Sequence, residues 1–79
     1  MKTMPPKPTL QLGTYRHYKG GLYKVIQLAC HTETLEWYVV YQSLERQKQK
    51  LPSIWIRPYT MFIEELNVGG KVVKRFEKV

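Results

Sequence analysis

The chain consists of short β-prone runs separated by glycine or polar turns, and no segment has the periodicity of a long helix. Two glycine pairs, Gly20–Gly21 and Gly69–Gly70, can supply the positive φ that tight turns need. The run Trp37–Leu44 (WYVVYQSL) has the strongest β character and predicts a central strand. This spacing favours one small all-β domain, a barrel or roll of five to six antiparallel strands.

The expected elements can be placed along the chain. The strands are expected over residues 14–19, 22–31, 37–44, 54–57 and, as a closing hairpin, 62–68 with 71–76. The second strand has apolar residues on both faces, which is typical of a bulge or a strong bend.

The remaining segments are expected to connect or precede the strands. One helical turn is predicted near 59–64, with Met61 and Phe62 facing inward. The charged segment 45–50 could form a helical turn on its own, but between two strands it is predicted to be an exposed loop. Residues 1–9 contain three prolines and predict a flexible arm in front of a single domain over 10–79.

Length and cysteine content limit the classes of function. A chain of 79 residues buries only roughly 60% of its unfolded surface, so a shallow groove or a flat face is easier to build than a deep substrate cavity. We therefore expect no enzyme and no cofactor. Cys30 is the only cysteine, which favours a reducing compartment, and no apolar run predicts a signal peptide or a membrane span. We expect a cytoplasmic monomer.

The net charge of +7 suggests an acidic partner such as nucleic acid. Nearly all of this excess lies in the N-terminal arm, in segment 46–50 and in residues 71–79, whereas the rest of the chain is close to neutral. A solvated surface is the simpler explanation of such segments. The candidates for phosphate contacts are Arg46, Lys48, Lys50, Lys71, Lys74 and Arg75.

The two histidines have several possible roles. His17 and His31, with Glu33 and Glu36, could supply nitrogen and oxygen ligands to a metal or form a general acid–base pair. Their spacing matches no metal signature, so no metal is predicted. The structural alternative is a hydrogen bond between a histidine and a glutamate that ties the first strand to the second.

Arg57 lies between Trp55 and Pro58 on a short predicted strand, and alternation should place Trp55 and Arg57 on one face. An arginine beside an indole could hold an anion, a carboxylate or a base. Alternatively, Arg57 could form an ion pair with Glu33 or Glu36. Among the aromatic residues, Tyr23, Tyr41 and Trp55 are expected to be largely core.

Several motifs occur together in one order. They are Tyr15–Gly20 (YRHYKG), Ala29–Thr34 (ACHTET), Val39–Tyr41 (VVY) and Trp55–Pro58 (WIRP), followed by Met61 and Phe62. As a set, they resemble a mainly bacterial family of small domains with no assigned function, whose members look like SH3-type barrels. The resemblance spans residues 12–76. It implies the SH3-like fold but no activity, and the segment after Tyr41 departs from the family's glycine-containing turn.

The sequence thus favours a binding module that recognises a protein segment or a small ligand. Its polar-aromatic face is expected to combine His17, Lys19, His31, Glu33, Glu36, Trp55 and Arg57. The alternative is an RNA- or DNA-binding module that uses the basic arm, loop and C-terminal segment. A third hypothesis is hydrolytic or metal-dependent chemistry at His17, His31 and Glu33.

Overall fold

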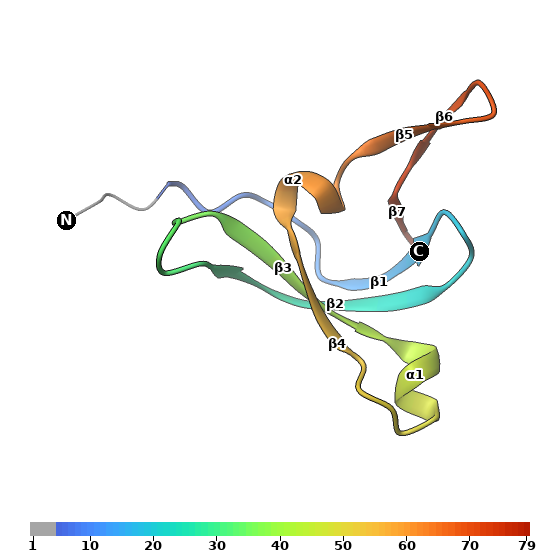
Figure 1. Ribbon diagram of the computed structural model, residues 1–79, viewed down its shortest axis with the longest axis horizontal. Helices are drawn as coiled ribbons and strands as arrows, with labels where there is room; N and C mark the ends of the chain where they lie inside the picture. Colours follow the sequence, from blue (N-terminus) through green and yellow to red (C-terminus); the bar gives the residue numbers. More distant parts are fainter. Residues whose placement is uncertain (1–4) are drawn as a thin grey trace.

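A computed structural model describes residues 5–79, which form seven antiparallel strands and two short helices (Figure 1). The expected small all-β, barrel-like fold is confirmed. The elements are β1 (Gly13–His17), β2 (Leu22–Cys30), β3 (Trp37–Ser43), α1 (Leu44–Lys48), β4 (Ile54–Pro58), α2 (Tyr59–Phe62), β5 (Glu65–Val68), β6 (Lys71–Lys74) and β7 (Phe76–Lys78).

The strand count exceeds the expected five to six because the C-terminal run changes partner at Arg75. Before Arg75, β6 pairs with β5, and after it, β7 pairs with β1. The backbone of Arg75 joins the two regions, since its N–H donates to the Glu64 carbonyl and its carbonyl accepts from the Tyr18 N–H, both at 2.9 Å. The β5–β6 hairpin therefore projects from the main sheet (Figure 1).

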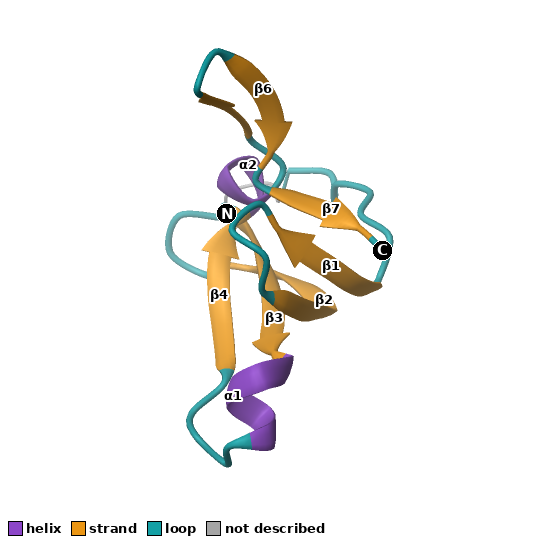
Figure 2. Cartoon of the chain, turned by 90° about the vertical axis from the view of Figure 1, so that its right-hand side faces the viewer, coloured by secondary structure: helices purple, strands orange, loops and turns teal. Residues whose placement is uncertain are grey.

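The main sheet has the order β4-β3-β2-β1-β7, which leaves β4 and β7 at its two margins (Figure 2). The predicted irregularity in the second strand is confirmed, because the register against β3 shifts between Val25 and Gln27. Val25 pairs with Tyr41 and Gln27 pairs with Val40, so Ile26 is an extra residue. Such a bulge bends the strand and increases its twist, which curls the sheet.

The hydrophobic core lies inside this curl. It consists of Tyr15, Val25, Val39, Tyr41, Phe62 and Phe76. The predicted helical turn is present as α2, and its Phe62 ring stacks on Phe76 with centroids 4.2 Å apart. The inward orientation predicted for Met61 is wrong: its side chain is 52% exposed, because a helix of one turn directs only some of its residues at the sheet. Trp55, expected to be core, is 40% exposed.

Segment 45–50 is not the predicted loop, because most of it belongs to helix α1. The Ser43 Oγ accepts from the Arg46 N–H at 3.3 Å and caps the first turn. At the other end, the N–H of Lys50 donates to the Gln47 carbonyl and the N–H of Leu51 donates to the Arg46 carbonyl, which is the Schellman pattern. With both ends satisfied, five residues are enough for a short helix.

The N-terminal segment contacts the domain in its described part. The indole N–H of Trp37 donates to the Pro5 carbonyl at 3.1 Å, and the Tyr59 hydroxyl donates to the Thr9 carbonyl at 3.4 Å. Residues 1–4 of the predicted flexible arm lie outside the described residues, so the flexibility of the arm stays a prediction. Within residues 5–79, no helix is long and apolar enough to cross a membrane.

Candidate functional site

A shallow concavity of about 420 Å³ lies where β4 and α1 approach the ends of β1, β2 and β7. We call it the concave site, and its lining residues are His17, Tyr23, Tyr41, Arg46, Trp55, Ile56, Arg57 and Phe76. Three of these residues are basic, four are aromatic and none is acidic. The concave site is therefore suited to an anionic group that lies next to a flat apolar one.

Strand β4 and helix α1 supply the exposed part of the concave site. Trp55 and Arg57 are two residues apart on β4 and line the same hollow, as alternation predicts. Arg46 enters from α1, and its guanidinium lies over the Trp55 ring at 5.4 Å from the centroid. The Arg46 Nε also donates to the Pro52 carbonyl at 2.7 Å, which holds the guanidinium in place.

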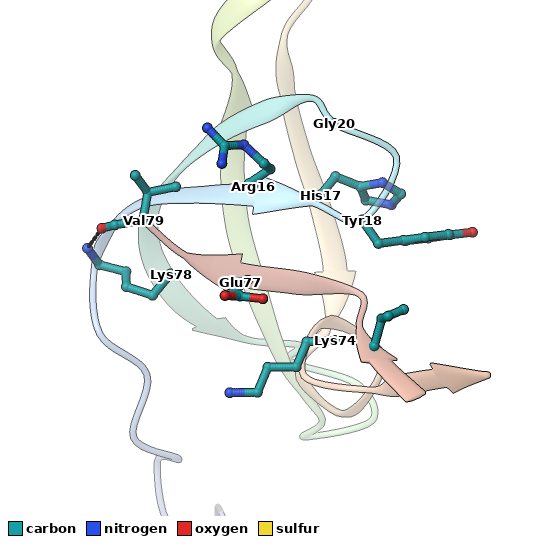
Figure 3. Close-up of a pocket in the computed structure, with 9 residues that line it drawn as sticks. Arg16, His17, Tyr18, Gly20, Lys74, Glu77, Lys78 and Val79 are labelled. Atoms are coloured by element: carbon teal, nitrogen blue, oxygen red, sulfur yellow. Dashed lines mark hydrogen bonds between the residues drawn. The ribbon is translucent and has the colours of Figure 1, made fainter. Parts of the chain in front are cut away.

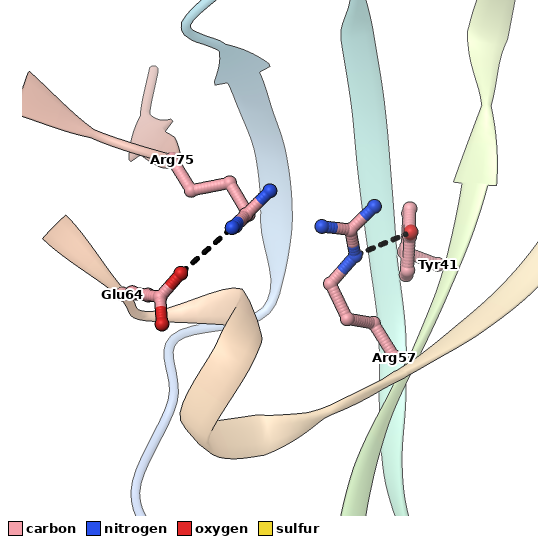
Figure 4. A network of polar contacts seen from close by, with 4 residues as sticks. All are labelled: Tyr41, Arg57, Glu64 and Arg75. Atoms are coloured by element: carbon pink, nitrogen blue, oxygen red, sulfur yellow. Dashed lines mark hydrogen bonds and ion pairs between the residues drawn. The ribbon is translucent and has the colours of Figure 1, made fainter. Parts of the chain in front are cut away.

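Arg57 is anchored by core residues rather than by an acidic one. Its Nε donates to the Tyr41 hydroxyl at 3.2 Å (Figure 4), and its guanidinium lies over the Phe76 ring at 5.5 Å. The ion pair with Glu33 or Glu36 that the sequence suggested is not formed. Among residues 5–79, Arg57 has no salt bridge, so its terminal nitrogens can donate to a ligand.

His17 completes the basic set at the end of β1. Its Nδ1 accepts from the Lys19 N–H at 3.1 Å, so the neutral ring carries its proton on Nε2 and can donate there. The ring packs edge-on against Phe76 at 4.9 Å. Burial, followed by the nearby charges of Arg57, Arg75 and Lys19, lowers the pKa of His17 below its ordinary value. These charges make this end of the sheet electropositive.

The other predicted polar residues lie elsewhere. His31, Glu33 and Glu36 belong to the turn between β2 and β3, at the end of β2 opposite to Tyr23. His31 Nδ1 accepts from the N–H groups of Glu33 and Thr34 at 3.1 and 3.2 Å, so the ring organises this turn. The predicted grouping with His17 does not occur, nor does the hydrogen bond between a histidine and a glutamate across two strands. Within the described chain, no group of three His, Cys, Asp or Glu residues could hold a metal ion.

A second hollow of about 350 Å³ lies between β1, β6 and β7. Its charged residues are of both signs, since Glu77 lies among Arg16, Lys74 and Lys78 (Figure 3). Glu77 lies opposite Arg16 in the β1–β7 register. Because a carboxylate in the lining repels a bound anion, the second hollow is a poorer anion site than the concave site.

The basic residues predicted to contact phosphates do not form one surface. Lys48 and Lys50 belong to α1 and its end, whereas Lys71 and Lys74 lie on the hairpin at the opposite end of the molecule (Figure 1). Arg75 forms an ion pair with Glu64 at 2.7 Å (Figure 4). Only Arg46 of this set lines the concave site.

Sequence reasoning missed part of the lining. Phe76 has no sequence signal that marks it as a lining residue, and Tyr23 and Tyr41, which were expected to be largely core, also line the concave site. Tyr41 is indeed 5% exposed, yet its hydroxyl reaches Arg57. The sequence does carry a signal for Arg46, because Ser43 stands three residues before it, at the distance that an N-cap serine needs.

Comparison with known proteins gives one family and one structure. The model of the family described as "Protein of unknown function (DUF1653)" matches residues 13–78. The crystal structure of a protein of that family from Bordetella bronchiseptica is 33% identical, covers 89% of this chain and 87% of its own, and superposes with a TM-score of 0.79. No curated protein matches the sequence.

Proposed function

Because this chain belongs to the DUF1653 family, whose function is unknown, we propose from its geometry that it is a small binding module for acidic groups. The concave site is the place of binding, and the ligand is a protein segment or a small molecule that carries a carboxylate. The observation that supports this proposal is the set of three basic side chains packed on aromatic rings, with no acidic residue in the lining.

The stacked arrangement favours binding at the edges of the two guanidinium groups. Arg46 lies over Trp55 and Arg57 lies over Phe76. The Nε–H of each arginine is already bonded within the protein, so the two terminal NH2 groups of each guanidinium are left to bind a ligand. A planar guanidinium with free edge donors can bind a carboxylate through two parallel hydrogen bonds. His17 adds a neutral N–H donor close by.

The shape of the site supports binding rather than catalysis. An open hollow of about 420 Å³ buries only part of a ligand and does not exclude water from it. Within residues 5–79, the two histidines and the acidic residues near His31 do not converge on one point, as an acid–base pair would require.

The nucleic-acid alternative has weaker support. A polyanion is usually bound by a continuous basic stripe, whereas Lys48, Lys50, Lys71 and Lys74 lie on two elements at opposite ends of the molecule. The concave site is also short compared with the strand of nucleotides that such a stripe follows. We therefore treat nucleic-acid binding as an outcome that would contradict the proposal.

The test is a titration followed by NMR, with glutarate as probe and neutral glutaramide as its match. The Trp37→Phe variant leaves Trp55 as the single tryptophan, so one indole signal reports on the concave site. Glutarate should shift the indole N–H of Trp55 and the Nε–H signals of Arg46 and Arg57 saturably, and glutaramide at equal ionic strength should not.

The same sample is then titrated with dT12 and rU12 at two salt concentrations. Oligonucleotide binding that falls steeply with salt, together with no response to glutarate, would favour the alternative and overturn the proposal.

A further inference from the structure

Strand β4 presents an open and largely apolar edge next to the concave site. It pairs only with β3, and no strand lies on its other side in the described sheet (Figure 2). Three successive side chains on it are exposed: Ile54 at 53%, Trp55 at 40% and Ile56 at 63%. An exposed apolar edge strand is a template for pairing with another extended chain.

The hydrogen-bond pattern shows which backbone groups face β3. The Ser43 N–H donates to the Ser53 carbonyl at 2.9 Å, so these opposed residues form a hydrogen-bonded pair. In an antiparallel ladder such pairs recur at every second residue. In the register of β3 and β4, the next two pairs on β4 are therefore at Trp55 and Arg57, whose N–H and C=O groups point toward β3.

The intervening residues turn their backbone groups outward. Ile54 and Ile56 lie in the non-hydrogen-bonded pairs, so their N–H and C=O groups point away from β3 toward the open edge. The next outward position is Pro58, which has no N–H to donate. The free edge thus offers backbone N–H donors and C=O acceptors at Ile54 and Ile56. At Pro58 it offers no N–H donor.

The charge of the adjoining surface determines what kind of chain fits. Trp55 and Arg57 project into the concave site, and Ile56 between them also lines it. A strand added beside β4 would direct every second side chain into the concave site, next to Arg46 and Arg57. Acidic side chains at those positions complement this charge, and apolar side chains at the alternate positions would lie beside Ile54 and Ile56.

A second copy of this chain fits the edge less well. Two β4 strands paired antiparallel around Ile56 would set Arg57 of each copy diagonally across from the other, and each Arg46 would add to the same charge. These positive charges repel one another, and the lining of the concave site has no acidic residue that would offset the repulsion.

We propose that the open edge of β4 binds an extended acidic peptide by strand addition, with its acidic side chains in the concave site. This inference rests on the proposed function and specifies its partner, an acidic protein segment in which acidic and apolar residues alternate. Affinity then comes from the backbone of Ile54 and Ile56, and selectivity comes from Arg46 and Arg57.

The test uses the acetylated and amidated peptide Val-Glu-Val-Glu-Val-Glu, with Val-Gln-Val-Gln-Val-Gln as its neutral match. At saturation, the backbone amides of Ile54 and Ile56 should shift downfield and gain protection from hydrogen exchange. The amides of Trp55 and Arg57, already bonded to β3, should keep their protection. The glutamine peptide should bind at least about tenfold more weakly.

A pair of variants tests the backbone contact separately. Ile56→Pro removes the outward N–H and leaves the hydrogen bonds to β3 intact, as Pro58 already does two residues later. This variant should bind the peptide about tenfold more weakly and should still bind glutarate. Ile56→Val keeps the N–H and should bind as the wild type does. If Ile56→Pro does not fold, the Ile54 and Ile56 amide signals of the wild-type protein still show whether the peptide adds to the edge of β4.

The possible outcomes separate this inference from the proposed function. If glutarate binds but the peptide leaves the Ile54 and Ile56 amides unchanged, strand addition is wrong and anion binding stands. If neither probe binds, both are wrong. If these amides become protected at high protein concentration without peptide, and the mass in solution doubles, a second copy covers the edge and the inference is overturned.

Discussion

The Nε–H of Arg57 donates to the phenolic oxygen of Tyr41 at 3.2 Å. The Tyr41 ring is part of the hydrophobic core, where it packs edge-on against Phe62 and Phe76, with centroids 5.5 Å away in each case. A core residue thus orients a guanidinium of the concave site. This link lets the hydroxyl be tested separately from the ring.

We expect Tyr41→Phe to reduce glutarate affinity several-fold, because Arg57 loses the acceptor that orients it. The core ring is retained, so the loss of unfolding free energy should be only about 1 kcal/mol. Tyr15→Phe is the matched control: it removes a hydrogen bond of 2.6 Å to the Gln11 carbonyl outside the concave site. Calorimetry and the NMR titration check both variants, and equal affinity losses would contradict the role given to Tyr41.

Arg57→Gln should abolish most glutarate binding while leaving the fold intact. Within the described residues Arg57 makes one side-chain hydrogen bond and no ion pair, so its removal should change the unfolding free energy by about 1 kcal/mol or less. Arg16 is an exposed residue of β1 outside the concave site, so Arg16→Gln should bind glutarate as the wild type does. A Tm that falls by many degrees in Arg57→Gln would instead make Arg57 a structural residue.

The stability of the domain should depend on His17 in the acid range. Because burial and then the charges of Arg57, Arg75 and Lys19 lower the pKa of folded His17, the unfolded chain binds this proton first. The contribution of His17 is therefore fully present above its ordinary pKa of about 6.5 and is lost as the pH falls through the lowered pKa of the folded state. His17→Gln should flatten this part of the curve of Tm against pH, and an unchanged curve would contradict the prediction.

Glutarate binding should show the opposite pH trend at the same residue. A bound anion favours the charged imidazole, so affinity should rise as the pH falls from neutral toward the lowered pKa of His17. The rise should be absent in His17→Gln. Titrations at pH values between 5 and 8 would measure it, with glutarate itself remaining ionised over most of that range.

Lys50→Gly should stabilise the domain by about 1 kcal/mol. Lys50 has φ 57° at the left-handed position of the Schellman motif that ends α1, where glycine has no steric cost. Lys48→Gly, two residues earlier within the helix, should instead destabilise by about 1 kcal/mol. Chemical denaturation measures both changes, and a loss of stability in Lys50→Gly would contradict the account of this helix end.

The sequence predicted the strands well where the signal was local. β-rich runs and glycine pairs located β2, β3 and the two hairpin turns. The apolar residues on both faces of β2 indicated its bulge. For helix α1 the loop was preferred over a helical turn, because the stability of this helix comes from caps at Ser43 and Lys50 rather than from a periodic apolar face. For a helix of one or two turns, the end groups are most of its hydrogen bonds.

The spatial grouping of the candidate site residues was predicted only in part. His17, Trp55 and Arg57 do line one hollow, but His31, Glu33 and Glu36 form a separate turn. Trp55 was expected to be largely core because a domain of 79 residues must build its core from several of its aromatic residues. Its strand lies at the margin of the sheet, where a neighbouring strand flanks its side chains on one side only, and Trp55 stays 40% exposed.

What the sequence determined by itself was the β class and most of the strand segments, because alternation and turn chemistry act over a few residues. What only the tertiary structure decided was which distant side chains meet. Arg57 contacts Tyr41 and Phe76, not Glu33 or Glu36, because the sheet order and the β2 bulge bring β4 and β7 over the same core. Strand order and register depend on long-range packing, which local patterns do not specify.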